Sequence, residues 1–255
     1  MSTQSPLTEL IERDVEYTHD GTRMIGLLVA PVTASSEAPL PGILLVHDAF
    51  GLGEDMTATA RRYAQLGYAV FAADVWGERT QPTEGSQIGP LIGSMVSDRE
   101  RWMGRMAAAH AAMVAQPEVD AGAVAAAGYC FGGSSALEFA RTGGDVRGAI
   151  GIHAGLDVLD SDWSAPGPVE RVLICTGSAD PMATAEQRDA LQDALTGAGV
   201  DWETDLYSGA QHAFTNPKSD LPGMPPGVGY DARASQRAWD STARFLADLL
   251  TPASA

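Results

Sequence analysis

Three residues of this 255-residue chain have the types and the order of a nucleophile with a supporting acid and base. Cys130 offers a thiol, Asp180 follows it by 50 residues, and His212 follows Asp180 by 32. A thiol attacks only as the thiolate and is mostly protonated at neutral pH, so it needs a base. An imidazole can take that proton and later return it, and a carboxylate can orient the imidazole. The three side chains together predict acyl transfer through a cysteine nucleophile.

The segment around Cys130 has the pattern of a sharp strand-to-helix turn. Residues 128–133 read Gly-Tyr-Cys-Phe-Gly-Gly, after the apolar run Val124–Ala127 and before a helix expected over Gly133–Arg141. A nucleophile at such a turn has a strained backbone, and flanking glycines let neighbouring elements approach closely. The following helix N-terminus favours a thiolate and an oxyanion alike. Alone, the pattern fits a small buried cysteine beside a turn equally well.

The candidate acid and base each follow a predicted strand. Asp180 comes after Arg171–Thr176, and His212 comes after Trp202–Tyr207. In open α/β sheets, functional groups gather at the carboxyl ends of the strands, so we expect both residues to lie near Cys130. Taken singly, Asp180 would be read as a helix cap and His212 as a surface histidine. The order nucleophile, acid, histidine is the one that α/β-hydrolases use.

Further residues near the turn are candidates for supporting roles. The backbone amides of Phe131 and Ala49 are expected to form the oxyanion hole. Asp48 is a possible accessory residue that could influence the thiol, although it could equally cap the helix that follows. Tyr129 and His153 are also possible accessory residues, because one adjoins the nucleophile and the other ends an apolar strand.

The rest of the chain alternates strand-like and helix-like segments. This alternation predicts βαβ units, and hence an α/β fold of the α/β-hydrolase type, with a mostly parallel central sheet and helices on both faces. Without a linker or repeat, residues 1–255 are expected to form a single domain. Trp76–Met95 is expected to be a long loop or lid, Ser97 to cap a helix over Ser97–Val114, and the last five residues to fray.

Composition and charge narrow the classes of partner. The chain is 45% hydrophobic and 19% charged, with a net charge of −17. Such an acidic surface disfavours nucleic acid and anionic membranes. Neither a signal peptide nor a run of 18 apolar residues is evident, so the expected location is the cytoplasm.

Three other readings remain open. The chain could be a non-catalytic or regulatory protein on a hydrolase scaffold. Cys130 and Cys175 could form a redox pair, although no Cys-x-x-Cys is present. Ser134 could be the nucleophile, although it lies past the turn.

The chain resembles the dienelactone hydrolase family from about Thr18 to Leu250. The resemblance rests on the 128–133 turn, on Asp48-Ala49-Phe50-Gly51, on Tyr68-Ala69-Val70 leading to Asp74, on Gly177-x-x-Asp180, and on His212-x-Phe214. It implies a Cys-Asp-His triad and hydrolysis of an enol-lactone, as by a carboxymethylenebutenolidase. It also implies a small-molecule ester or lactone substrate, no metal, no organic cofactor, and a monomer or small homo-oligomer.

Two positions depart from the family pattern. The best-known members hold a glutamate where this chain has Asp48. They also bind the substrate carboxylate with arginines, one just after the catalytic histidine, where this chain has Thr215-Asn216-Pro217. The remaining candidates for a substrate-binding cation are four arginines in the expected lid and the helix after it, namely Arg79, Arg99, Arg101 and Arg105.

Overall fold

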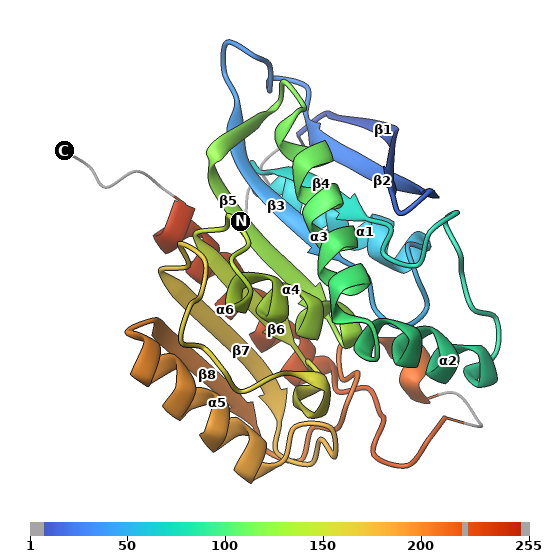
Figure 1. Ribbon diagram of the computed structural model, residues 1–255, viewed down its shortest axis with the longest axis vertical. Helices are drawn as coiled ribbons and strands as arrows, with labels where there is room; N and C mark the ends of the chain where they lie inside the picture. The colour runs from blue at the N-terminus through green and yellow to red at the C-terminus, as the bar shows by residue number, and fades with distance from the viewer. Residues whose placement is uncertain (1–7, 221–223, 251–255) are drawn as a thin grey trace, which may run out of the picture.

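A twisted sheet of eight strands forms the centre of the protein (Figure 1). The computed structural model describes residues 8–220 and 224–250, so the last five residues, expected to fray, lie outside it. The strand order is β1-β2-β4-β3-β5-β6-β7-β8, parallel from β4 onward. The strands are β1 (Leu10–His19), β2 (Thr22–Pro31), β3 (Leu40–Val46), β4 (Ala69–Ala73), β5 (Val119–Tyr129), β6 (Gly148–Ile152), β7 (Arg171–Gly177) and β8 (Asp201–Tyr207).

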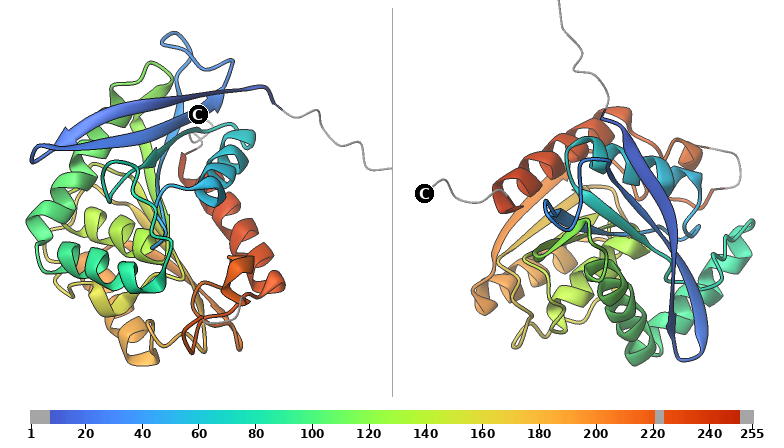
Figure 2. Two further views of the ribbon diagram at one scale, coloured as in Figure 1. Left: turned by 90° about the vertical axis from the view of Figure 1, so that its right-hand side faces the viewer. Right: turned by 90° about the horizontal axis from the view of Figure 1, so that it is seen from above.

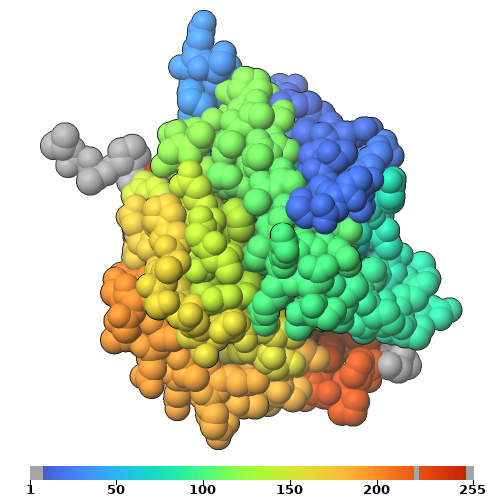
Figure 3. Space-filling model, in the orientation of Figure 1, coloured from blue at the N-terminus to red at the C-terminus, as the bar shows by residue number. Residues whose placement is uncertain are grey.

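Helices cover both faces of the sheet (Figure 2). Helices α3, α4 and α5 pack on the face turned to the viewer in the space-filling view, where the blue atoms of β1 and β2 stay visible beside them (Figure 3), whereas α1 and α6 pack on the other face. The helices are α1 (Glu54–Gln65), α2 (Gly85–Val96), α3 (Arg99–Val114), α4 (Phe131–Arg141), α5 (Ala185–Ala198) and α6 (Ala232–Leu250), with 3₁₀ turns η1 (Leu156–Val158) and η2 (Pro217–Asp220). The predicted α/β fold is confirmed.

The central strands are apolar because both of their faces are buried. In β3, Leu44 and Val46 face the α3–α4 side, while Ile43 and Leu45 face the α1–α6 side. Alternate side chains of a strand point to opposite faces, so a covered strand needs an unbroken apolar run. The predicted edge strand is also confirmed, because β8 lies at the end of the sheet.

The prediction of an irregular segment over Trp76–Met95 was wrong in its second half. Residues 85–96 form α2, which starts where the Gln87 side chain accepts hydrogen bonds from the backbone amides of Thr83 (2.8 Å) and Glu84 (3.2 Å). The sequence did not predict this helix because its glycines and Pro90 are typical of loops. Ser97 ends α2 and does not cap α3. The cap is Asp98, whose Oδ1 accepts from the Arg101 amide at 3.0 Å.

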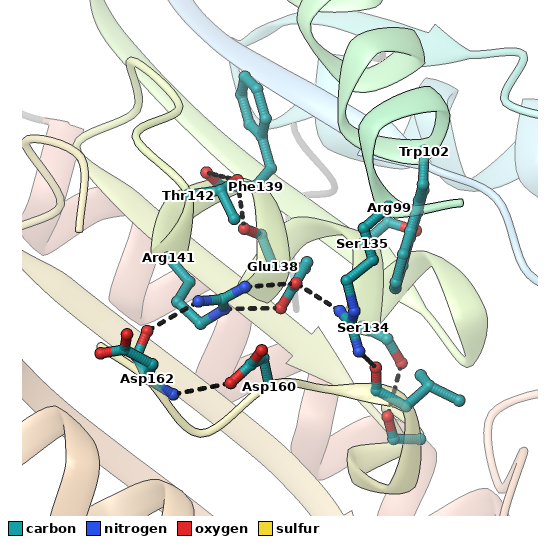
Figure 4. Close-up of polar contacts among 12 residues, drawn as sticks. Arg99, Trp102, Ser134, Ser135, Glu138, Phe139, Arg141, Thr142, Asp160 and Asp162 are labelled. Atoms are coloured by element: carbon teal, nitrogen blue, oxygen red, sulfur yellow. Dashed lines mark hydrogen bonds and ion pairs between the residues drawn. The ribbon is translucent and has the colours of Figure 1, made fainter. Parts of the chain in front are cut away.

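A buried carboxylate fixes α4 against its neighbours (Figure 4). Glu138 is fully buried and pairs with Arg99 of α3 at 2.5 Å and with Arg141 at 2.7 Å. Arg99 also donates to the carbonyl of Val158, and Arg141 donates to that of Asp162. The cluster thereby connects α3, α4 and the segment that contains η1.

No helix in the described ranges is long and apolar enough to cross a bilayer.

We expect the double variant Arg99→Ala/Arg141→Ala to lose about 3–5 kcal/mol in free energy of unfolding, because Glu138 would stay buried without a partner. Urea denaturation measures this loss. The control is Arg147→Ala, which breaks an exposed pair with Glu170 and should cost less than about 1 kcal/mol. Equal losses in the two proteins would show that the cluster contributes no more to the free energy of unfolding than an exposed ion pair does.

Candidate active site

Cys130 lies at a strained bend between β5 and α4. Its backbone has φ 54° and ψ −121°, a conformation that non-glycine residues rarely adopt. The bend is tight because a Cβ on Gly132 would come within 2.2 Å of the Val46 carbonyl oxygen. A Cβ on Gly128 would come within 2.1 Å of the Gly132 oxygen. Glycines at both positions therefore let α4 begin directly against the ends of β3 and β5.

The structure brings the three candidate catalytic side chains together. Cys130 Sγ is 3.0 Å from His212 Nε2, and His212 Nδ1 is 3.0 Å from Asp180 Oδ2. Asp180 and His212 are each only 3% exposed. The second carboxylate oxygen of Asp180 accepts from the Met182 amide at 2.8 Å, which fixes the plane of the acid. The imidazole therefore bridges a buried acid and a sulfur.

Loops after β7 and β8 carry the acid and the histidine, and they are tied to each other. The Ala179 amide donates to the Ala210 carbonyl at 3.0 Å. His212 exchanges two backbone hydrogen bonds with the segment 227–229, at 2.9 and 3.1 Å. Gly227 in that segment lies against Pro181, where a Cβ would come within 2.6 Å. The separation of Asp180 from His212 is thus set by backbone contacts as well as by their own hydrogen bond.

The charges around His212 favour its protonated form. Burial lowers its pKa, but attraction to a Cys130 thiolate and hydrogen bonding to Asp180 outweigh burial and raise the pKa to about 10. An imidazolium at this position can hold a thiolate on one side and a carboxylate on the other. The geometry therefore suits a thiolate–imidazolium pair.

His153 contacts the backbone of the bend. Its Nδ1 accepts from the Cys130 amide at 3.1 Å, so its proton lies on Nε2, which is 2.8 Å from Thr215 Oγ1. Burial, together with the charge of His212, lowers the pKa of His153 well below its usual value. The sequence did not single out Thr215. The feature that could have pointed to Thr215 is its position three residues after His212.

Two backbone amides are free to bind an oxyanion next to Cys130. Phe131 is the first residue of α4, and Ala49 lies in the loop after β3, where it lines the cavity that holds Cys130. Within the described ranges, neither amide donates a hydrogen bond to another protein group. The indole of Trp76 links the two residues, since it stacks on Phe131 with ring centroids 4.7 Å apart and donates to the Ala49 carbonyl.

Asp48 and Tyr129 also lie at the site. Asp48 lines the same cavity as Cys130, and its Oδ1 accepts from the Phe50 amide at 2.9 Å. Burial raises the pKa of Asp48 to about 6. The Tyr129 hydroxyl is 3.2 Å from the Tyr63 hydroxyl, and burial raises its pKa to about 12, so it stays neutral.

The cavity above Cys130 has a volume of about 370 Å³. Residues 81–83 line it, so the first half of the expected lid reaches the site, whereas α2 does not line it. None of the four arginines proposed from the sequence lines it, because their guanidinium groups bond elsewhere. Arg79 pairs with Asp14, Arg99 with Glu138 and Arg101 with Asp98, while Arg105 donates to backbone carbonyls. The cation that does line the cavity is Lys218 of η2, which sequence reasoning missed.

The structure disfavours two of the alternative readings, namely Ser134 as nucleophile and Cys130 with Cys175 as a redox pair. Ser134 is fully buried and donates to the Gly155 carbonyl at 2.8 Å, so a backbone oxygen and not a base receives its proton. Cys175 is a free, fully buried thiol in β7. Burial raises its pKa to about 12, which suppresses its thiolate.

Comparisons with known proteins agree with this architecture. The sequence pattern of the dienelactone hydrolase family matches residues 26–250. A solved dienelactone hydrolase-like promiscuous phosphotriesterase from metagenomic libraries is 36% identical, with a TM-score of 0.88 over 95% of this chain and 99% of that one. An uncharacterized protein of Caenorhabditis elegans is 32% identical over 60% of this chain and 97% of its own length. The family resemblance seen in the sequence is thus confirmed, and the chain belongs to the dienelactone hydrolase family.

Proposed function

We propose that this protein hydrolyses carboxylic ester or lactone bonds, with Cys130 as nucleophile, His212 as acid and base, and Asp180 as the residue that orients His212. The observation that carries the proposal is the pair of 3.0 Å contacts, from sulfur to imidazole and from imidazole to carboxylate. This chain of contacts begins at a strained bend that opens a helix, where the helix dipole favours negative charge.

The first half of the reaction forms a thioester. The Cys130 thiolate attacks the carbonyl carbon, and the amides of Phe131 and Ala49 donate to the resulting oxyanion. When the tetrahedral intermediate collapses, the carbon–oxygen bond to the leaving group breaks. His212 Nε2 gives its proton to the departing oxygen, and Asp180 stabilises the imidazolium until that transfer.

The second half releases the acid and regenerates the site. Neutral His212 takes a proton from water, and the hydroxide attacks the thioester carbon. Collapse of the second intermediate expels the Cys130 thiolate, which again lies against a protonated His212. Because a thiolate is a better leaving group than an alkoxide, this nucleophile suits esters with stable leaving groups. We expect enol and aryl esters, or enol-lactones, to react faster than alkyl esters.

A second candidate reaction is phosphotriester hydrolysis. The structural relative that is 36% identical is described as a promiscuous phosphotriesterase, and the match covers 95% of this chain. The same thiolate could attack phosphorus, and the same amides could bind the phosphoryl oxygen. Displacement of an aryloxide would again use the His212 proton. An aryl phosphotriester therefore belongs in the substrate panel beside aryl esters and enol-lactones.

Cys130→Ala should lower kcat/KM for aryl esters and enol-lactones by at least about a thousandfold, because the thioester can no longer form. Initial rates across the panel measure the effect. Cys175→Ser is the matched control, since it removes the other thiol away from the site and should keep most of the activity. Unchanged turnover in Cys130→Ala would refute the proposed nucleophile. A wild-type protein inert across the panel would favour a non-catalytic role.

His212 should titrate near pH 10 in the wild-type protein. Because this pKa lies above the usual 6.5, the ionic contribution of His212 to folding stability is complete below about pH 6.5. It is lost as the pH rises through about 10. In Cys130→Ser the attraction of the thiolate is absent while burial remains, so the midpoint should fall by more than about one unit.

The measurement is the pH dependence of the His212 ring C–H signals in NMR, assigned by comparison with His212→Asn. A wild-type midpoint near 6.5 that does not move in Cys130→Ser would contradict the thiolate–imidazolium pair.

A further inference from the structure

A second cavity adjoins the one that holds Cys130. Its volume is about 240 Å³, and it lies between α1 and α6, with Arg62 and Trp239 on its walls. The two cavities share five lining residues, namely Asp48, Asp55, Met56, His153 and Asn216. Because they share these residues, the two cavities lie side by side next to Cys130.

The walls of the second cavity are largely apolar and held in place. Trp239 packs on Tyr63 with ring centroids 4.8 Å apart, and the Tyr63 hydroxyl contacts that of Tyr129, which also lines the cavity. Further apolar lining comes from Met56, Ala58, Ile152, Pro217 and Ala238. An apolar cavity of about 150 Å³ already accommodates benzene, so this one has room for an aromatic ring.

The charges at the second cavity disfavour an anion. Among its described lining residues the cation is Arg62, whose guanidinium lies over the Trp239 ring at 3.8 Å from the centroid and is stabilised there. Asp48 and Asp55 also line the cavity, and Lys218 forms an ion pair with Asp55 at 2.5 Å and attracts Asp48. Because the charge of Arg62 is engaged by Trp239 and that of Lys218 by Asp55, the described lining offers no unengaged cation to a substrate carboxylate. The net charge of −17 adds a general repulsion of anions.

We propose that the cavity lined by Arg62 and Trp239 is a second substrate subsite, which receives an uncharged aromatic arm of the ester. This inference rests on the proposed function, because it assigns the two arms of one ester to two adjoining cavities. It places specificity on the inner face of α6 and on α1, away from the loop that carries Cys130.

The test uses three vinyl or phenyl esters that differ in where the ring lies. Vinyl acetate is the small reference, vinyl phenylacetate carries the ring in the acyl arm, and phenyl acetate carries it in the alcohol arm. Ser235 of α6 lines the second cavity, so Ser235→Phe should fill it. The next residue, Gln236, is exposed and bonds only Asp240, so Gln236→Phe is the matched control.

The expected result is that Ser235→Phe lowers kcat/KM for one of the two ring-bearing esters, relative to vinyl acetate, by about tenfold or more. Gln236→Phe should leave that ratio unchanged. In the wild type, vinyl (4-carboxyphenyl)acetate should react at least about tenfold more slowly than vinyl phenylacetate if the acyl arm is the affected one. If the alcohol arm is the affected one, 4-carboxyphenyl acetate should react at least about tenfold more slowly than phenyl acetate.

Two kinetic results would overturn the proposal. One is that Ser235→Phe leaves the ratio of kcat/KM for the ring-bearing ester to kcat/KM for vinyl acetate unchanged with both ring-bearing esters. The other is a carboxylated ester that reacts as fast as its neutral partner.

A binding experiment separates failure of the subsite from failure of the proposed reaction. Phenylacetamide, which is neutral and inert, is added to Cys130→Ala, and saturation-transfer NMR detects its ring protons. Signal that is lost in Cys130→Ala/Ser235→Phe but kept in Cys130→Ala/Gln236→Phe supports the subsite even if no ester is hydrolysed. Equal signal in the two double variants, or none in Cys130→Ala, would overturn it.

Discussion

The start of α4 must lie almost in contact with the end of β3, and the rest of the site depends on this contact. Gly132 faces the Val46 carbonyl at a distance that no side chain fits. Because the helix begins this close to the sheet, the chain must reverse direction within one residue, and that residue is Cys130. The reversal lifts the sulfur above the sheet edge, where the loops after β7 and β8 deliver Asp180 and His212.

Two neighbouring imidazoles show how contacts, and not location, set protonation. The rings of His153 and His212 lie 5.4 Å apart and are both buried. His212 lies between a sulfur and a carboxylate, and its pKa is raised. His153 accepts a hydrogen from the Cys130 amide, which it can do only while that nitrogen is unprotonated, and its pKa is lowered. In the proposed mechanism, His212 is thus the ring that transfers a proton, while His153 holds the backbone of Cys130.

Sequence reasoning located the parts of the site that depend on local pattern. The Gly-x-Cys-x-Gly turn and the apolar strands could be predicted because each reflects a steric or burial requirement of its own segment. Helix α2 was missed because its start depends on the reach of Gln87 to two backbone amides, among residues typical of loops. Lys218 and Trp239 were missed because their place at the cavities depends on how η2 and α6 pack, and neither element carries a motif.

The backbone conformation of residue 130 lowers the stability of the fold and at the same time positions the sulfur. A positive φ is natural for glycine and unfavourable for any residue with a β-carbon, by roughly 1–3 kcal/mol. The chain therefore keeps a cysteine at a position where a residue without a side chain would relax the fold. The excess energy is balanced by the surrounding contacts of α4, β3 and His153. A glycine at this position would be less costly to the fold, so the presence of a sulfur at this bend fits a chemical role better than a structural one.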